Sequence, residues 1–278
     1  MNGPSTIPAD AHAYITGRLN DLAASEGVRI LFAIESGSRA WGFPSADSDY
    51  DVRFVYVRTR EDYLSVREFR DVIETPTVDD PTLSVPLDLN GWDIRKALRL
   101  GLTSNPVLHE WLVSPIRYLD QNPDVDQLRT FAAKAANADV YRYHYDRLCR
   151  GAWIEISTDP DRAMVKRYCY ALRPALMLAW LSHYDTLPPM DVYSLCAGLT
   201  LADDTVSSLA GLFEMKRTGG EKDMIPRVPA LDRLIAEQLE NIVPRPPKLD
   251  INHHSLMTAA DELFVCLFSS EGALSSNA

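Results

Sequence analysis

The first 120 residues alternate between helical and strand-like hydrophobic patterns. Residues 9–26 carry apolar side chains at helical spacing up to Gly27, which favours a helix that ends at the glycine. Two compact apolar runs rich in β-branched and aromatic residues, 28–36 and 50–58, are each typical of a buried strand. Later patterns predict two more strands and then two helices, within 69–76, 81–93, 93–105 and 106–115. Residues 1–122 therefore predict a small α/β domain built on a mixed sheet.

The pattern changes near residue 123, where helical periodicity takes over until the end of the chain. Proline-rich loops separate the helical stretches. The predicted helices lie at 124–156 with an internal break, 159–184, 189–199, 203–217, 228–242 and 253–269. We therefore expect residues 123–278 to form an all-helical domain, so that the whole chain has an α+β fold.

Composition narrows the classes of partner. The chain has 278 residues with 28 basic and 39 acidic side chains, a net charge of −11, which argues against a protein that coats nucleic acid. A local basic patch or bound metal ions could still serve one nucleic-acid end or a nucleotide. Four scattered cysteines, no secretory pattern at the N-terminus and no long apolar run predict a cytoplasmic protein without a membrane partner.

Three aspartates at alternate positions, Asp47, Asp49 and Asp51, precede and enter the second predicted strand. They could be calcium ligands, but Val52 and Arg58 stand where an EF-hand loop needs glycine and glutamate. They could also form an ordinary solvated acidic turn. The third interpretation is a metal site, because residues two apart on a strand project side by side, about 7 Å apart along the chain.

The segment before the aspartates favours the metal site. Asp49 and Asp51 would repel each other unless cations lie between them, and Mg²⁺ prefers oxygen ligands and keeps positions open for phosphates. Two such ions about 3.5–4 Å apart are a common device for displacement at phosphorus. Gly37 and Ser38 end the first strand, where backbone N–H groups and a hydroxyl could bind a triphosphate. Two Mg²⁺ ions, or Mn²⁺ in their place, are therefore the expected cofactors.

The stretch from Gly37-Ser38 to Asp49-Tyr50-Asp51 resembles the signature of the DNA polymerase β nucleotidyltransferase superfamily. In its longer form, "GSRAWGFPSADSDYDVRFVYV", it is similar to the branch of predicted nucleotidyltransferases of an RNA-repair pathway. Residues 91–116 and 166–181 also resemble later blocks of that branch. Together these blocks span most of residues 30–220.

The resemblance implies a third carboxylate from a later strand, which completes the metal site and can accept a proton from the attacking hydroxyl. Asp88, between Leu87 and Leu89, has the pattern of a half-buried strand residue, whereas Asp93 suits a helix N-cap. We choose Asp88 over Asp93, so the expected catalytic and metal-binding set is Asp49, Asp51 and Asp88.

The resemblance also implies that the helical domain closes over a bound nucleotide. Lys166, Tyr170 and Arg173 share one helical face, where they could contact a triphosphate and a base or simply form a solvated face. Arg39 could approach the triphosphate or lie exposed. Arg53 could reach a phosphate or pair with the acidic cluster. With Gly37 and Ser38, these five residues are the expected nucleotide-binding set.

The expected activity is transfer of NMP from an NTP to a hydroxyl acceptor, with release of pyrophosphate. The resemblance points to an RNA end, such as that of a tRNA, as the acceptor, and a protein or a small molecule stays open as an alternative acceptor. Two alternatives remain: a catalytically silent nucleotide-binding module, or an NMPylating enzyme of a toxin–antitoxin or phage-defence pair. The sequence does not indicate an oligomeric state.

Overall fold

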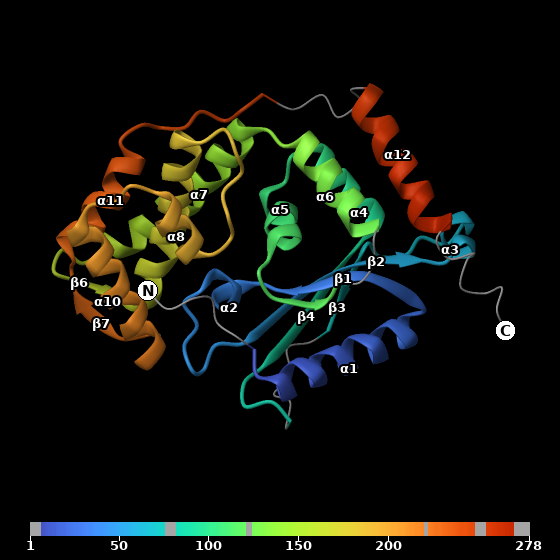
Figure 1. Ribbon diagram of the computed structural model, residues 1–278, viewed down its shortest axis with the longest axis horizontal. Helices are drawn as coiled ribbons and strands as arrows, with labels where there is room; N and C mark the ends of the chain where they lie inside the picture. The colour runs from blue at the N-terminus through green and yellow to red at the C-terminus, as the bar shows by residue number, and fades with distance from the viewer. Residues whose placement is uncertain (1–6, 76–81, 121–123, 220–221, 248–253, 270–278) are drawn as a thin grey trace. The chain divides into compact units, whose positions relative to one another are not determined.

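The computed structural model describes residues 7–75, 82–120, 124–219, 222–247 and 254–269 (Figure 1). The described residues divide into two compact units. The sheet unit comprises Thr6–Ser36, Asp49–Ala136 and the C-terminal helix, and it contains a five-stranded sheet. The helical unit comprises Gly37–Ser48 and Asn137–Pro247. The mixed sheet and the many helices confirm the predicted α+β class.

The sheet unit contains the predicted N-terminal helix and strands with small shifts of their ends. Its elements in chain order are α1 (Ala9–Glu26), β1 (Val28–Glu35), β2 (Tyr50–Arg58), α3 (Arg60–Leu64), β3 (Val72–Glu74), β4 (Leu87–Asp93), α4 (Ile94–Leu102), α5 (Pro106–Val113), β5 (Arg117–Leu119), α6 (Asp124–Ala135) and α12 (His254–Ser269). Gly27 ends α1 in the left-handed conformation, with φ of 62°, as the pattern predicts. The short strand β5 was not predicted.

The sheet has the strand order β3-β4-β2-β1-β5. The central strands β2 and β4 are parallel, and the other neighbours pair antiparallel. Because β2 and β4 run in the same direction, the residues that enter both strands gather at one end of the sheet. The starts of these two strands carry Asp51 and Asp88.

Each face of the sheet has its own hydrophobic core. Val52, Phe54 and Tyr56 of β2 pack with the buried side chains of α1. Val55 and Val57, on the opposite face, pack with side chains of α4, α5, α6 and α12. Figure 1 shows α1 on one side of the sheet and α4, α5 and α6 on the other. The alternation along β2 therefore assigns Asp51 and Arg53 to the face of Val55.

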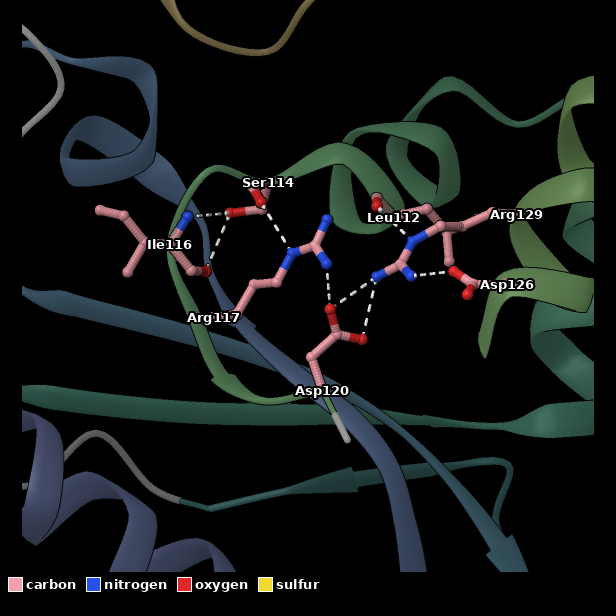
Figure 2. Close-up of polar contacts among 7 residues, drawn as sticks. All are labelled: Leu112, Ser114, Ile116, Arg117, Asp120, Asp126 and Arg129. Atoms are coloured by element: carbon pink, nitrogen blue, oxygen red, sulfur yellow. Dashed lines mark hydrogen bonds and ion pairs between the residues drawn. The ribbon is translucent and has the colours of Figure 1, made fainter. Parts of the chain in front are cut away.

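Asp120, directly after β5, forms ion pairs with two arginines (Figure 2). Asp120 accepts two hydrogen bonds from Nη2 of Arg129 in α6, at 2.9 and 2.8 Å, and also pairs with Arg117. Nε of Arg129 donates to the carbonyl of Leu112 at the end of α5, at 3.2 Å. The guanidinium of Arg129 thus joins α5, α6 and the end of β5 in one ion-pair network.

The helical unit consists mainly of helices packed around α8. Its elements are α2 (Gly37–Trp41), α7 (Ala138–Ile156), β6 (Arg162–Met164), α8 (Val165–His183), α9 (Val192–Gly198), α10 (Asp203–Thr218), β7 (Met224–Pro226) and α11 (Pro229–Leu239). The prediction of helices alone misses the small ladder of β6 and β7. Asp232 of α11 links that helix to α8 and to the end of β7. Its carboxylate accepts a 2.6 Å hydrogen bond from the Tyr168 hydroxyl of α8 and pairs at 3.1 Å with Arg227, which follows β7.

The two compact units do not follow the division into 1–122 and 123–278 that the sequence predicts. Helices α6 and α12 belong to the sheet unit, because Phe131 and Leu263 join the hydrophobic core on the face of Val55. Segment Gly37–Ser48 belongs to the helical unit. The predicted boundary itself, at residues 122 and 123, lies outside the described residues. No helix within the described ranges has the length and hydropathy that a membrane-spanning segment needs.

Candidate functional site

Asp51 and Asp88 face each other across the parallel strands β2 and β4. They are direct register partners, so their side chains project from the same face of the sheet. Both are partly accessible, with side-chain exposures of 32% and 29%. The structure therefore brings together two of the three carboxylates that the sequence predicts as catalytic, one from each strand.

Arg53 neutralises this pair of carboxylates. Its Nη2 lies 3.2 Å from Oδ1 of Asp51 and 2.9 Å from Oδ2 of Asp88. Its Nη1 donates to the carbonyls of Val52 and Asp88, at 3.0 and 3.3 Å, which fixes the guanidinium along the strand. The structure thus shows one of the two roles considered for Arg53, the ion pairs with Asp51 and Asp88. Binding to a phosphate stays a prediction.

Asp49 lies one residue before β2 and is exposed, as is Asp47 in the preceding turn. Within the described residues, no three His, Cys, Asp or Glu side chains are close enough to hold a metal ion together. Asp51 and Asp88 do supply the carboxylate oxygens that Mg²⁺ prefers, at a solvent-accessible position that already holds a cationic group. The residues thus fit a divalent cation, and the full set of Asp49, Asp51 and Asp88 stays a prediction.

Asp93, the rival third carboxylate, caps a helix. Its Oδ1 accepts from the backbone N–H of Arg95 at 2.8 Å, and its Oδ2 accepts from the hydroxyl of Tyr63 at 2.9 Å. Asp93 pairs in register with Tyr56, so it lies on the face opposite to Asp51 and Asp88. Burial raises the pKa of the Asp93 carboxyl above its ordinary value. This geometry favours Asp88 as the partner of Asp51.

Glu35 is a residue near the carboxylates that sequence reasoning missed. It ends β1 and is completely buried. Its Oε1 accepts from the backbone N–H of Asp51 at 2.9 Å, and its Oε2 accepts from the hydroxyl of Tyr118 at 2.6 Å. The Ser114 hydroxyl donates to its carbonyl at 2.7 Å. Glu35 therefore holds the backbone of Asp51 in place, and only its acidic character inside an apolar run could have indicated this role.

The Gly37–Ser38 turn lies in the helical unit and begins the short helix α2. Gly37 has φ of 61°, a left-handed conformation that strongly favours glycine. The Ser38 hydroxyl donates to Oγ of Ser48 at 3.0 Å, and Nη2 of buried Arg39 donates to the carbonyl of Ser48 at 2.5 Å. Oγ of Ser48 also accepts from the backbone N–H of Ser45 at 2.9 Å. Ser48, which the sequence analysis did not single out, therefore fixes the loop that carries the predicted phosphate-binding residues.

Two of the predicted residues of α8, Tyr170 and Arg173, contact the Trp41 ring of α2. The guanidinium of Arg173 lies 4.5 Å from the Trp41 ring, and the ring of Tyr170 meets Trp41 edge-on at 5.5 Å. Nζ of Lys166 lies 5.9 Å from the Tyr170 ring. Arg173 is buried, and its Nε donates to the carbonyl of Met190 at 3.1 Å. The structure thus groups Lys166, Tyr170 and Arg173, and it adds Trp41, which the sequence analysis left unassigned.

Comparisons with known proteins find one matching protein family and one similar protein that each cover most of the chain. A family model described as "RNA repair pathway DNA polymerase beta family" matches residues 11–266 of the chain. An uncharacterized protein of Bacillus subtilis (strain 168), YcgL, is 37% identical over 251 residues, which are 90% of this chain and 94% of that protein. Among solved structures, a nucleotidyltransferase-like protein from Exiguobacterium sibiricum 255-15 matches at 11% identity and a TM-score of 0.31, over 92% of this chain and 74% of that one. That structural likeness is too weak to support an argument about the site.

Proposed function

Because the chain belongs to the RNA repair pathway DNA polymerase beta family, a family of nucleotidyltransferase type, we propose that it transfers NMP from an NTP to a hydroxyl acceptor in a metal-dependent reaction. The observation that carries the proposal is the in-register pair of Asp51 and Asp88 on one face of the sheet. Enzymes of the polymerase β type generally use divalent metals. Asp49, one residue before β2, is proposed to complete the set together with Asp51 and Asp88.

The proposed reaction is a displacement at the α-phosphorus of the NTP. A bond forms between the acceptor oxygen and the α-phosphorus, the bond to the β-phosphate oxygen breaks, and pyrophosphate leaves. Asp88 is proposed to accept the proton of the attacking hydroxyl. Divalent ions bound by Asp49, Asp51 and Asp88 would neutralise charge on the phosphates. Glu35, through the Asp51 N–H, keeps that carboxylate positioned for this task.

The nucleotide is proposed to contact residues of Gly37–Ser48 and of α8. Ser38 and the backbone of its turn would meet phosphate oxygens, with Arg39 as the support of the loop through Ser48. Lys166 and Tyr170 are accessible and would offer a charge and an aromatic face. Asp49 directly follows segment Gly37–Ser48, so the proposed phosphate-binding residues Gly37 and Ser38 and the carboxylates Asp49 and Asp51 are close in the chain.

The acceptor is proposed to be an RNA end, because the family description refers to RNA repair. The test is to incubate the full chain with each α-labelled NTP, Mg²⁺ and total cellular RNA or protein, and to identify what becomes labelled. Asp51→Ala and Asp88→Ala should abolish the labelling, whereas Asp47→Ala, which removes an exposed carboxylate of the same turn, should not. Full labelling by both of the first two variants would refute the site. Labelled protein instead of RNA would refute the RNA acceptor.

A further inference from the structure

A polar cavity lies at the opposite end of β2 and β4 from the carboxylate pair. Its volume is about 480 Å³, within the size range of small-molecule sites. Arg58 lies seven positions after Asp51 along β2, which places the cavity roughly 23 Å along the strand from the proposed reaction centre. Five arginines line it: Arg58, Arg67, Arg70, Arg95 and Arg99.

Arg58 is the buried member of this arginine group. Its residue is only 6% exposed, and its Nε has no hydrogen-bond partner among the described residues. The rings of Phe69 and Tyr56 lie 4.7 and 5.4 Å from its guanidinium, so aromatic faces hold the group in place. A buried guanidinium nitrogen without a hydrogen-bond partner is costly, and an anion in the adjoining cavity would reduce that cost.

The acidic residues around the cavity leave most of the arginines unpaired. Both oxygens of Asp93 accept hydrogen bonds from Arg95 N–H and Tyr63, and Asp71 pairs with Lys96 at 3.2 Å. Arg70 pairs with Glu74 at 3.6 Å. Asp62 and Glu68 complete the acidic lining. Within the part of the chain that the structure describes, no ion pair joins Arg58, Arg67, Arg95 or Arg99 to a carboxylate. Four guanidinium groups without a close ion pair therefore border one cavity, although the charges of Arg58 and Arg95 still act on the Asp93 carboxyl, in a chain of net charge −11.

The chemistry of the lining favours phosphate among anions. Guanidinium groups bind phosphate oxygens through two parallel hydrogen bonds, and several of them together suit an anion with more than one charge. The Tyr63 ring in the lining already carries a cation, because Arg95 lies 4.3 Å from it. The described lining is thus dominated by positive charge.

We propose that this cavity, at the ends of β2 and β4, is a binding site for a phosphate group, held by Arg58 with Arg95 and Arg99. The phosphate could come from a free polyphosphate or from the backbone of a bound RNA, since both present the same oxygens. The site does not depend on nucleotidyl transfer, and it requires no metal ion.

The test is calorimetric titration of the full chain with inorganic pyrophosphate in EDTA, so that metal-dependent binding is suppressed. The wild type should bind, and Arg99→Met should weaken binding about tenfold or more through loss of a charge-assisted contact. Arg58→Met should weaken it further. Because Arg58 is buried, its variant could fail to fold, whereas Arg99 is exposed on α4 and its variant decides the result. Arg233→Met, which removes an exposed arginine of the helical unit, is the matched control and should bind like the wild type.

Three results would overturn the proposal: no binding of pyrophosphate, binding that Arg99→Met leaves unchanged, or equal weakening by Arg233→Met. A second arm identifies the source of the phosphate. If a short single-stranded RNA competes with pyrophosphate and loses affinity in Arg99→Met, the site accepts an RNA backbone. If only free polyphosphate competes, the site is specific for a small anion. Loss of NMP transfer in Asp51→Ala with intact pyrophosphate binding separates this proposal from the proposed function.

Discussion

Replacing Arg53 by methionine is expected to make the stability of the protein depend on divalent metal. The substitution keeps an apolar side chain of similar length but removes the charge between Asp51 and Asp88. Side chains opposite each other on neighbouring strands are about 5 Å apart. Two like charges at that distance repel by about 3 kcal/mol at an effective dielectric constant near 20, and by about 1 kcal/mol in water.

The side chains of Asp51 and Asp88 are both about one third exposed, so the expected repulsion between them lies between the values for water and for a dielectric constant near 20. We therefore expect Arg53→Met to lower the free energy of unfolding of the metal-free protein by about 1 to 3 kcal/mol. Mg²⁺ should restore it, because an ion at about a hundredfold excess over its dissociation constant stabilises a fold by about 2.7 kcal/mol. In the wild type, the ion must compete with the guanidinium, so its stabilising effect should be smaller.

The measurement is urea unfolding followed by circular dichroism, with EDTA or with increasing Mg²⁺. Arg233→Met breaks a 2.6 Å ion pair with Asp204 that is more than half exposed on both sides, so it should change the free energy of unfolding by less than about 1 kcal/mol, with no response to Mg²⁺. The reasoning fails if metal-free Arg53→Met is as stable as the wild type. It also fails if Mg²⁺ stabilises both proteins equally.

Three further substitutions test local features of the sheet unit and of the turn. Gly91→Ala should destabilise the fold by about 1–3 kcal/mol in urea unfolding, because a Cβ there would lie 2.1 Å from the ring of Phe54; a neutral effect would contradict that packing. Gly37→Ala should cost about 1–2 kcal/mol, since alanine must adopt φ of 61°. Asp93→Asn keeps a good N-cap but cannot ionise. Burial raises the folded-state pKa of Asp93 above the unfolded value, so its protonated form stabilises the fold below about pH 4, and this stability is lost as pH rises through the folded-state pKa. The stability of Asp93→Asn relative to the wild type should therefore increase from acid to neutral pH, and a constant difference would refute the assignment.

The sequence could predict that Asp51 and Asp88 are strand residues with accessible side chains, because period-two patterns define which strand residues share a face. The same patterns distinguish Asp88, between two buried leucines, from Asp93 at the start of a helix. Register between β2 and β4 was not predictable, since these strands are separated by a long connection. Glu35 was missed for a related reason: its role depends on Tyr118, which comes from the unpredicted strand β5.

The sequence also could not predict which helices belong to which compact unit. Periodicity identifies an apolar face but not the face that will cover it. Phe43 stacks on Phe213 of α10 at 5.6 Å, and this contact ties the loop after α2 to helices far along the chain. Tyr63 meets Phe264 of α12 edge-on at 5.2 Å, which ties the last helix to the sheet unit. Both contacts join residues about 170 or more positions apart.

The path of the chain between the two compact units limits how they can be separated. The backbone leaves the sheet unit after Ser36, returns at Asp49, leaves again after Ala136 and returns after Pro247. Neither unit is therefore a continuous piece of polypeptide. A fragment that ends near residue 122 would lack α6 and α12 of the sheet unit, and a fragment that starts there would lack the Gly37–Ser48 loop. Neither half could be transplanted into another protein or studied alone, and heat or urea should melt the molecule in one cooperative step.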